Sequence, residues 1–202
     1  MRKHLNVVLV LLFVSAAAFG QDHRFDVSLG GTYAIYTHAS ENGIDQDPTN
    51  AFGFLGTVRA RFGPHHSFQF NYGHTRNSQN YTAPPFQFAV QSVQAEFSGS
   101  YIYNFAPRGK FEPFVTVGAG TLVFTPEETF VNGILTGFGA TREYRPAFLY
   151  GGGFDYPIYK RFSARVQYRG LVYSNPDFNV SRIFVGGKAH TAEPGVGIVF
   201  KF

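Results

Sequence analysis

The chain has 202 residues, a formal net charge of +4 and no cysteine, and only 15% of its residues are charged, below the roughly 25% of an average soluble domain. The lack of cysteine excludes a disulfide scaffold, a thiolate metal site and a cysteine nucleophile, and the scattered basic residues give no basis for nucleic-acid binding. Rings and small residues replace the missing charges, with 24 phenylalanines, 12 tyrosines and 23 glycines in a length that predicts one domain.

Residues 1–20 have the pattern of an export signal. A basic start at residues 2–4 precedes an apolar run at residues 7–14, and small residues follow. Ala18 and Gly20 stand at the −3 and −1 positions that signal peptidase accepts, so we expect cleavage before Gln21. The apolar run is shorter than the about 20 residues that span a membrane as a helix, which argues against a retained anchor. We therefore predict a signal peptide at 1–20, a mature domain at 21–202, and export from the cytoplasm.

From residue 25 onward, apolar and polar side chains alternate with a period of two. In the first segment Phe25, Val27 and Leu29 occupy one phase, and Asp26 and Ser28 occupy the other. An amphipathic helix would repeat about every 3.6 residues, so this alternation predicts half-buried β-strands. We predict eight strands, at residues 25–35, 52–62, 67–75, 92–105, 112–123, 147–156, 162–172 and 193–202.

The links between the predicted strands alternate in length. Short links that contain proline or glycine lie at residues 63–65, 106–110 and 157–160, and long polar links lie at residues 37–50, 76–86, 125–145 and 174–189. This order is typical of an outer-membrane barrel, in which short turns face the periplasm and long loops face outward. Each strand supplies about the 9–11 residues that cross such a wall, and a sheet in lipid must close on itself. We predict an all-β fold, an eight-stranded antiparallel up-and-down transmembrane β-barrel with both termini on the periplasmic side.

Charged residues within the strands fall almost entirely on the phase opposite the rings, so we expect rings toward lipid and charges toward the lumen. Five acidic and five basic residues share this inward phase: Asp26, Arg59, Arg61, Glu96, Glu112, Asp155, Arg165, Arg169, Glu193 and Lys201. Equal numbers favour a structural, mutually neutralised network, because an unpaired buried charge is costly. We expect Glu96 and Glu112 to reach across to Arg165 and Arg169. The alternative is a proton path or an ion-selective pore.

Bulky residues on the same inward phase argue against an open channel. Ile102, Phe114, Leu149 and Leu171 all point toward the predicted lumen. The interior of an eight-stranded barrel is just wide enough for side chains to fill. We therefore expect a plugged lumen.

The C-terminal segment ends in Phe202, with apolar residues at every second position before it, namely Val196, Ile198 and Phe200. Together with the export signal and the eight amphipathic strands, this ending resembles the OmpA-like and OmpX-like family of small outer-membrane β-barrels, over essentially all of residues 21–202. The resemblance implies that barrel-assembly machinery reads these four residues, and that the chain resides in the outer membrane of a Gram-negative-type bacterium, among outer-membrane lipid and lipopolysaccharide.

Two features depart from that family. Larger members add a peptidoglycan-binding domain, and the chain stops at the eighth strand, so that role is not carried over. Tryptophan is absent, so tyrosines would have to form the interfacial belts. These are Tyr33, Tyr72, Tyr101, Tyr150 and Tyr168, among others.

Some relatives in the family are enzymes that trim or acylate lipid A, so nucleophilic groups near a rim need attention. His38, Ser40 and Glu41 cluster after the first strand, but proximity in a polar loop does not show the hydrogen-bonded geometry that catalysis needs. His66-Ser67 lies at a predicted short turn and is a weaker candidate. We predict no catalytic residue.

The first long link also concentrates oxygen ligands, in Glu41, Asn42, Asp45, Asp47 and Asn50. The glycine and bidentate glutamate spacing of a calcium loop is absent. We therefore favour a polar loop over a cation site, and predict neither a metal nor a cofactor.

The third long link contains Asn132-Gly133 between apolar pairs, which is a strong hairpin signal. We expect the fifth and sixth strands to continue outside the membrane as a hairpin. Its apolar residues are Phe130, Val131, Ile134, Leu135 and Phe138. They would form a contact surface for adhesion or an unknown surface ligand; the alternative is packing against neighbouring loops.

These observations favour a non-enzymatic outer-membrane barrel, a structural wall element that presents long extracellular loops for adhesion or surface interaction. The alternatives are a narrow pore for small solutes and a lipid A-modifying hydrolase.

Overall fold

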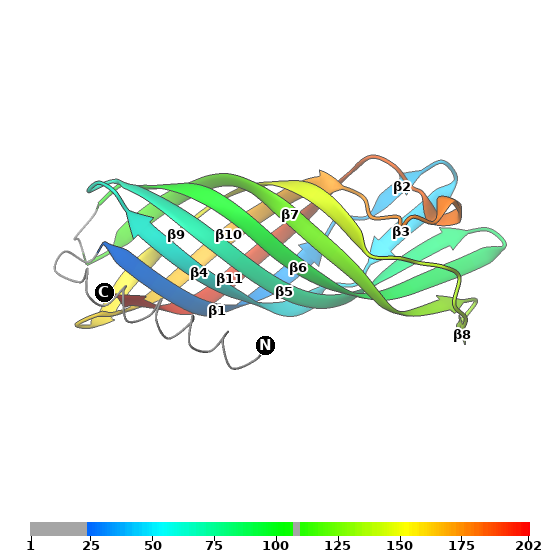
Figure 1. The fold of residues 1–202 in the computed structure, drawn as a ribbon, viewed down its shortest axis with the longest axis horizontal. Coiled ribbons are helices and arrows are strands. Elements are labelled where there is room, and N and C mark those ends of the chain that lie inside the picture. Colours follow the sequence, from blue (N-terminus) through cyan, green and yellow to red (C-terminus); the bar gives the residue numbers. More distant parts are fainter. Residues whose placement is uncertain (1–23, 107–109) are drawn as a thin grey trace, which may run out of the picture.

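The computed structural model describes residues 24–106 and 110–202, and the predicted signal peptide at 1–20 lies outside them. Eight long strands form the wall of a closed barrel (Figure 1). They are β1 (Phe25–Tyr36), β4 (Ala51–Arg61), β5 (His66–Ala83), β6 (Phe86–Asn104), β7 (Glu112–Val131), β9 (Glu143–Tyr159), β10 (Phe162–Ser174) and β11 (Lys188–Lys201).

Every neighbouring pair in the wall is antiparallel, and the strands follow chain order around the barrel. Strand β1 pairs with β4 on one side and with the last strand β11 on the other. Pairing of β5 with β6 completes the ring. The predicted eight-stranded up-and-down barrel is therefore confirmed.

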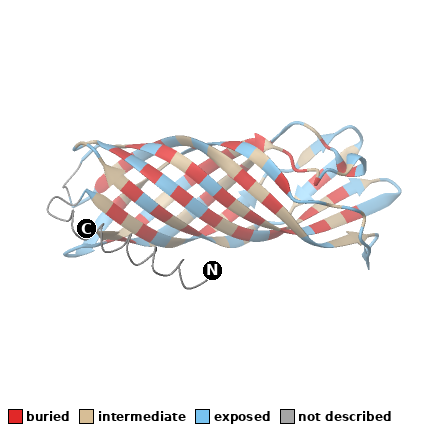
Figure 2. Ribbon diagram, viewed as in Figure 1, coloured by how far each residue is buried: buried red, intermediate tan, exposed pale blue. Residues whose placement is uncertain are grey.

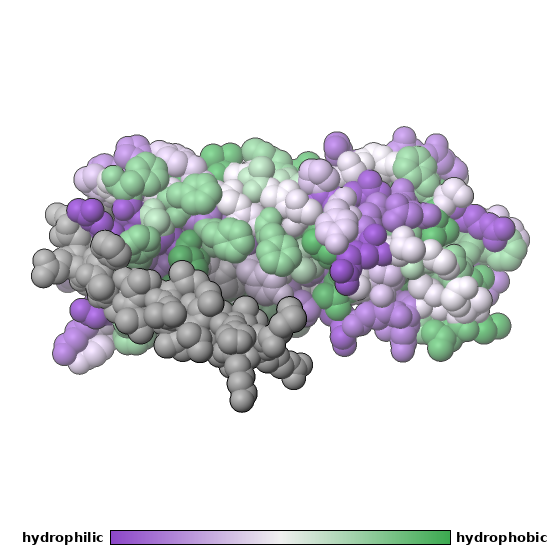
Figure 3. Space-filling model, viewed as in Figure 1, coloured by the Kyte–Doolittle hydropathy of each residue, from purple (hydrophilic) through white to green (hydrophobic). Residues whose placement is uncertain are grey.

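Buried and more exposed residues alternate along the wall strands (Figure 2). In β5, for example, Ser67, Gln69 and Asn71 are buried, whereas Phe68 and Phe70 are exposed. Closure gives the backbone groups of each wall strand two neighbours, which is the condition for a sheet in lipid. Figure 3 shows the resulting apolar side chains over the barrel wall.

The two ends of the barrel differ, and we call them the turn end and the loop end. The turn end carries the start of β1, the end of β11 and the short connections. The loop end carries β2 (Ala39–Glu41), β3 (Ile44–Pro48), β8 (Ile134–Leu135) and the one described helical turn, η1 (Ser181–Ile183). No helix in the described chain is long and apolar enough to cross a membrane.

The link predicted as a long loop at residues 76–86 is instead a hairpin. Strand β5 runs on to Ala83 and β6 starts at Phe86, and β3 pairs alongside β5. The sequence pattern missed this extension because the outward phase changes from rings to the polar residues Arg76, Ser78, Asn80 and Thr82. On the inward phase Gln79 and Tyr81 are buried. Residues 37–50 likewise contain the β2–β3 hairpin, which turns at Asn42-Gly43 with positive φ at both residues.

The predicted Asn132-Gly133 turn is confirmed. Both residues have positive φ, 49° and 78°, which matches the two-residue hairpin turn that Asn-Gly favours. Strand β7 extends to Val131 and pairs with β8. The returning strand, β8, is only two residues long, and β9 begins later, at Glu143.

Candidate functional site

All ten charged residues of the inward phase lie inside the barrel, and they separate into two groups. The turn-end charge cluster comprises Asp26, Arg59, Arg61, Glu112, Asp155, Arg165 and Lys201, and the central charge cluster comprises Glu96, Arg169 and Glu193. The first has four cations and three carboxylates, and the second has one cation and two carboxylates. Their formal charges of +1 and −1 therefore cancel across the lumen.

Arg165 is the centre of the turn-end charge cluster. Its Nε lies 2.7 Å from Asp155 Oδ1 and its Nη2 lies 2.9 Å from Asp155 Oδ2. Arg59 Nη1 lies 3.4 Å from Asp155 Oδ2, and both guanidinium carbons lie over the Phe114 ring, at 4.9 Å for Arg59 and 5.4 Å for Arg165. Paired charges and a bulky ring thus occupy the same cross-section of the lumen.

Glu112 does not reach the arginines that the sequence suggested. Its carboxylate accepts from Lys201 Nζ at 3.0 and 2.9 Å and lies 3.6 Å from Arg61. The register explains the difference. Glu112 is the first residue of β7 and pairs with Asp155, so it lies at the turn end, where Lys201 also lies.

The central charge cluster crosses the lumen from β6 to β10 and β11. Arg169 donates to both Glu96 oxygens, at 3.0 and 2.8 Å, and also contacts the Glu193 carboxylate. All three side chains are almost fully buried. The predicted contact between Glu96 and Arg169 is therefore present.

Neutral polar side chains that the sequence analysis did not single out connect the two clusters. Gln69 Oε1 accepts from Arg59 Nε at 3.0 Å, and Gln69 Nε2 donates to Asn71 Oδ1 at 2.5 Å. Asn71 donates to Ser98 Oγ at 2.9 Å, and Ser98 donates to Glu96 Oε1 at 2.6 Å. The only sequence feature that marks these residues is their position on the inward phase of the strands. One chain of hydrogen bonds therefore runs through the lumen from Arg59 to Glu96 and Arg169.

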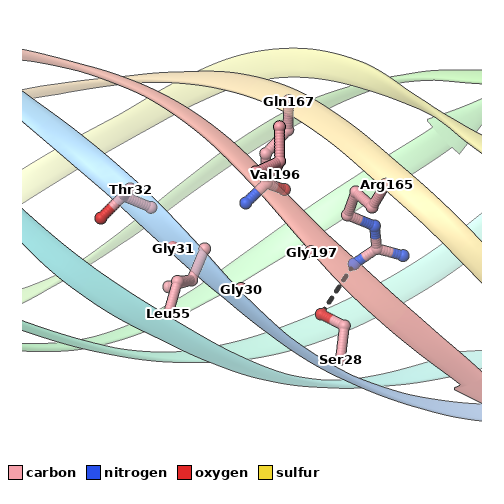
Figure 4. A pocket seen from close by; sticks show the side chains of 9 residues that line it. All are labelled: Ser28, Gly30, Gly31, Thr32, Leu55, Arg165, Gln167, Val196 and Gly197. Carbon is pink, nitrogen blue, oxygen red and sulfur yellow. Dashed lines mark hydrogen bonds between the residues drawn. The ribbon is translucent and has the colours of Figure 1, made fainter.

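A small cavity of about 10 Å³ lies against the inner wall where β1 meets β11. Figure 4 shows the residues that line it, with Arg165 Nη1 donating to Ser28 Oγ at 3.3 Å beside Gly30 and Gly197. A volume of this size holds about one water molecule. It offers no room for a solute.

An apolar layer closes the lumen on the loop-end side of the charges, and we call it the loop-end cap. Wall residues such as Leu122, Leu149 and Leu171 meet side chains from the segment 175–187, which folds back over the barrel mouth. The segment contributes Phe178, Ile183 and Val185, all almost fully buried. Ile102, Phe114, Leu149 and Leu171, the bulky inward residues of the sequence, are all buried.

Glu143 holds the segment 175–187, which we call the capping segment, in place. Its Oε2 accepts from the backbone N–H groups of Asp177 and Phe178, at 3.0 and 2.9 Å, and Arg145 contacts both Glu143 and Asp177. Glu143 is the first residue of β9, which has 17 residues. Only roughly 9–11 residues are needed to cross the membrane, so Glu143 lies outside the membrane-spanning part of the strand. Burial raises the pKa of the Glu143 carboxyl above its ordinary value.

The candidate catalytic residues do not assemble. His38 Nδ1 lies 4.0 Å from Asp47 Oδ1, and Ser40 lies on β2 in register with Asp45; no hydrogen bond joins His38 to Ser40. His66 contacts the Tyr101 hydroxyl on the outer face, whereas the adjacent Ser67 is buried on the inner face. In residues 24–106 and 110–202, no group of three His, Asp or Glu residues could hold a metal ion.

The five predicted contact residues of the third loop divide into two groups. Val131 and Phe138 pack against the loop-end cap, and the Phe138 ring lies 5.5 Å from the Phe88 ring. Ile134 and Leu135 are 69% and 64% exposed. Phe130 is half-buried and pairs with Leu135. We call Ile134 and Leu135 the apolar tip; it lies at β8, where Figure 3 shows apolar side chains at the end of the molecule.

The proposed assembly residues lie on the last strand, beside the first. Val196 and Ile198 are exposed on the outer face, and the Phe200 ring lies 5.1 Å from Phe162 and 4.9 Å from Phe202. The belt tyrosines Tyr72, Tyr101, Tyr150 and Tyr168 are exposed and Tyr33 is half-buried.

The family model for the outer membrane protein beta-barrel domain matches residues 7–200 of the chain. No curated protein matches the chain in sequence.

Solved structures share this fold at low sequence identity. Neisserial surface protein A is 16% identical, with a TM-score of 0.56, over 88% of this chain and 97% of that chain. OprG of Pseudomonas aeruginosa is 13% identical, with a TM-score of 0.53, over 88% and 95%. Ail, the attachment invasion locus protein of Yersinia pestis, is 14% identical, with a TM-score of 0.51, over 88% and 97%. At these identities the likeness concerns the fold alone.

Proposed function

Because the chain belongs to the outer membrane protein beta-barrel domain family, we propose that it is a non-enzymatic wall element of the outer membrane that presents extracellular loops for surface contact. The turn end then faces the periplasm and the loop end faces outward. The observation that carries the proposal is a lumen filled along its length, below an elaborate loop end with an exposed apolar tip.

The filled lumen disfavours the pore alternative. A solute would have to pass the loop-end cap, then the Arg169 pairs with Glu96 and Glu193, then the turn-end charge cluster. Breaking a buried ion pair by removing one partner costs about 3–5 kcal/mol, so the network does not open readily. We expect no channel conductance in planar bilayers, either for the wild type or for a deletion of residues 178–185, because the central charge cluster remains. Discrete conductance steps in the wild type would favour the pore.

The extended loop end supports a role in surface contact. Strands β5, β6 and β7 continue past the barrel wall and carry β3 and β8 on their outer sides. This gives the tip a rigid sheet support in place of a flexible loop. Exposed apolar residues supported in this way commonly mark interaction sites.

The contact role is tested with cells that display the protein. We expect the double substitution Ile134→Ser and Leu135→Ser to reduce adhesion to octyl-coated beads and to leave adhesion to uncoated beads unchanged. The matched control is Phe184→Ser, which removes an exposed ring from the capping segment, outside the tip. Equal adhesion of the wild type and the double variant would contradict the proposal.

We also propose that the signal at residues 1–20 directs export, and that Val196, Ile198, Phe200 and Phe202 are recognised by the barrel-assembly machinery. An exposed ringed edge strand is suited to pairing with another sheet edge before closure. Replacement of Phe202 by Ser is expected to lower the amount of folded protein in membrane fractions, measured in unheated gels. The exposed aromatic rings on the outer face are suited to contact with lipopolysaccharide and outer-membrane lipid.

The separation of His38 and Ser40 disfavours the hydrolase alternative. Mass spectrometry of lipid A from cells with and without the protein is expected to show no difference.

A further inference from the structure

Exposed charges are distributed unequally between the two ends of the barrel. Among the described residues, the exposed acidic side chains all lie at the loop end: Glu41, Asp45, Asp47, Glu127 and Glu128. The loop end also carries exposed basic residues, including Arg76, Arg142, Arg182 and Lys188, so its charge is mixed.

At the turn end the described exposed charged side chains are all basic, namely Arg24, Lys110, Lys160 and Arg161. We call Lys110, Lys160 and Arg161 the basic rim. The acidic side chains nearest to this end, Asp26, Glu112 and Asp155, are buried in the turn-end charge cluster and already paired. The C-terminal carboxylate of Phe202 is the one further anionic group at this end of the described chain.

Each member of the basic rim is next to an aromatic residue. Lys110 precedes Phe111, which is 51% exposed; Lys160 follows Tyr159, which is 62% exposed; and Arg161 precedes Phe162, which is 44% exposed. Lys160 Nζ lies 5.2 Å from the centre of the Tyr159 ring. The rings belong to the lipid-facing surface, so the adjacent cations lie at the boundary between lipid and water.

We propose that the basic rim binds the headgroup phosphates of anionic phospholipids in the membrane leaflet at the turn end, which is the periplasmic leaflet. Lysine and arginine beside lipid-facing rings extend their charged groups to headgroup depth, and an anionic lipid surface attracts each such cation. This inference rests on the proposed placement of the barrel in the outer membrane, and it adds a lipid class and a binding site to it.

The rings favour lipid over a soluble acidic partner. A protein or polymer that approached along the barrel axis would meet the cations but not the rings at their sides. A lipid contacts both, since its acyl chain lies along Phe111, Tyr159 or Phe162 while its phosphate lies at the cation. The paired arrangement recurs at two turns, those at Lys110 and at Lys160-Arg161, which argues for two similar lipid sites.

The test measures lipid selectivity by electron spin resonance, with the barrel reconstituted in phosphatidylcholine bilayers that contain spin-labelled phosphatidylglycerol or spin-labelled phosphatidylcholine. The fraction of motionally restricted label reports lipid at the protein surface. We expect the wild type to favour phosphatidylglycerol by roughly two- to fivefold at low salt, and 0.5 M sodium chloride to reduce the preference by screening.

The rim variant is Lys110→Gln, Lys160→Gln and Arg161→Gln combined, and its preference is expected to fall close to one. The matched control, Arg142→Gln, Arg182→Gln and Lys188→Gln, removes the same charge from the loop end and should keep most of the preference. All six side chains are exposed, and the heat-modified gel shift verifies that both variants fold.

Two results would overturn the inference, and they differ from failure of the proposed function. An unchanged preference in the rim variant, or an equal loss in the control, would show that the rim is not the lipid site. Absence of any restricted label in the wild type, with either lipid, would show that the barrel is not in the bilayer, and would contradict the proposed function as well.

Discussion

Arg169 on β10 and Glu96 on β6 form a bidentate ion pair across the lumen, with N···O distances of 3.0 and 2.8 Å. Strands β9 and β7 lie between them in the wall, so the pair ties together parts of the barrel that share no backbone hydrogen bonds. Glu193 shares the same guanidinium. One buried cation is therefore held by two carboxylates.

Removal of that cation should be the most costly single charge change in the lumen. The substitution Arg169→Met leaves Glu96 and Glu193 without their partner and changes the formal charge of the central charge cluster from −1 to −2. We expect a loss of about 3–5 kcal/mol in the free energy of unfolding. Because the chain has no tryptophan, urea unfolding in lipid vesicles is best followed by circular dichroism. The control Arg76→Met removes an exposed pair with Glu127, which should contribute little; an equal loss in both variants would contradict the prediction.

Arg165→Met should lower stability less than Arg169→Met, although both side chains are almost fully buried. Loss of Arg165 changes the turn-end charge cluster from +1 to 0, and Asp155 keeps Arg59 at 3.4 Å. On gels the folded barrel migrates as a compact band that is lost on heating. We expect the temperature at which this band disappears to fall for both variants, but further for Arg169→Met. The reverse order would show that cluster charge does not set the cost, and an unchanged midpoint for Arg165→Met would show that Arg165 does not stabilise the barrel.

The strands and their faces could be predicted from the sequence because lipid imposes a strict alternation. Every second side chain in the wall faces hydrocarbon, so Phe68 and Phe70 differ visibly from Ser67 and Gln69. The positions of the ten inward charges follow from the same period. Their partners do not, because pairing across a lumen depends on the stagger between strands; this is why Glu112 was assigned to the wrong arginines.

The loop end was predicted less well, because the outer face of its sheet no longer carries the rings that mark the lipid-facing wall. Residues 76–83 continue β5 with polar side chains on both faces, which a hydrophobic period cannot distinguish from a loop. The capping segment was not predicted for a different reason. Phe178, Ile183 and Val185 are irregularly spaced among polar residues, and only the backbone path of the segment brings them together over the barrel mouth.

The closure of the capping segment should depend on Glu143 and on pH. A carboxyl whose pKa is raised by burial binds its proton more tightly in the closed segment than in the open one. The free energy of opening should therefore rise as the pH falls through that pKa, and decrease above it. Hydrogen exchange at the amides of Asp177 and Phe178, corrected for intrinsic rates, should show protection kept or increased from pH 7 to pH 5.

The variant Glu143→Gln provides the control for this dependence, since it keeps a carbonyl oxygen as acceptor and removes the titrating group. Its protection factors should be flat with pH over the same range. Loss of protection in the wild type on acidification would mean that the closed segment favours the ionised carboxylate, contrary to the expected sign.

Two strands approach so closely at Gly118 that the position should accept no side chain. A Cβ atom there would lie 2.2 Å from the carbonyl oxygen of Gly99 and 2.7 Å from the Cα atom of Ser100. Relief requires the β6 and β7 backbones to separate, so Gly118→Ala should cost about 1–3 kcal/mol or more, as overpacking does. Gly56→Ala is the matched control, because its Cβ atom on the outer face would have Tyr72 O at 3.9 Å as its nearest neighbour. We expect the compact band of Gly118→Ala to be lost at a lower temperature than that of Gly56→Ala; equal midpoints would indicate that the wall yields at this contact.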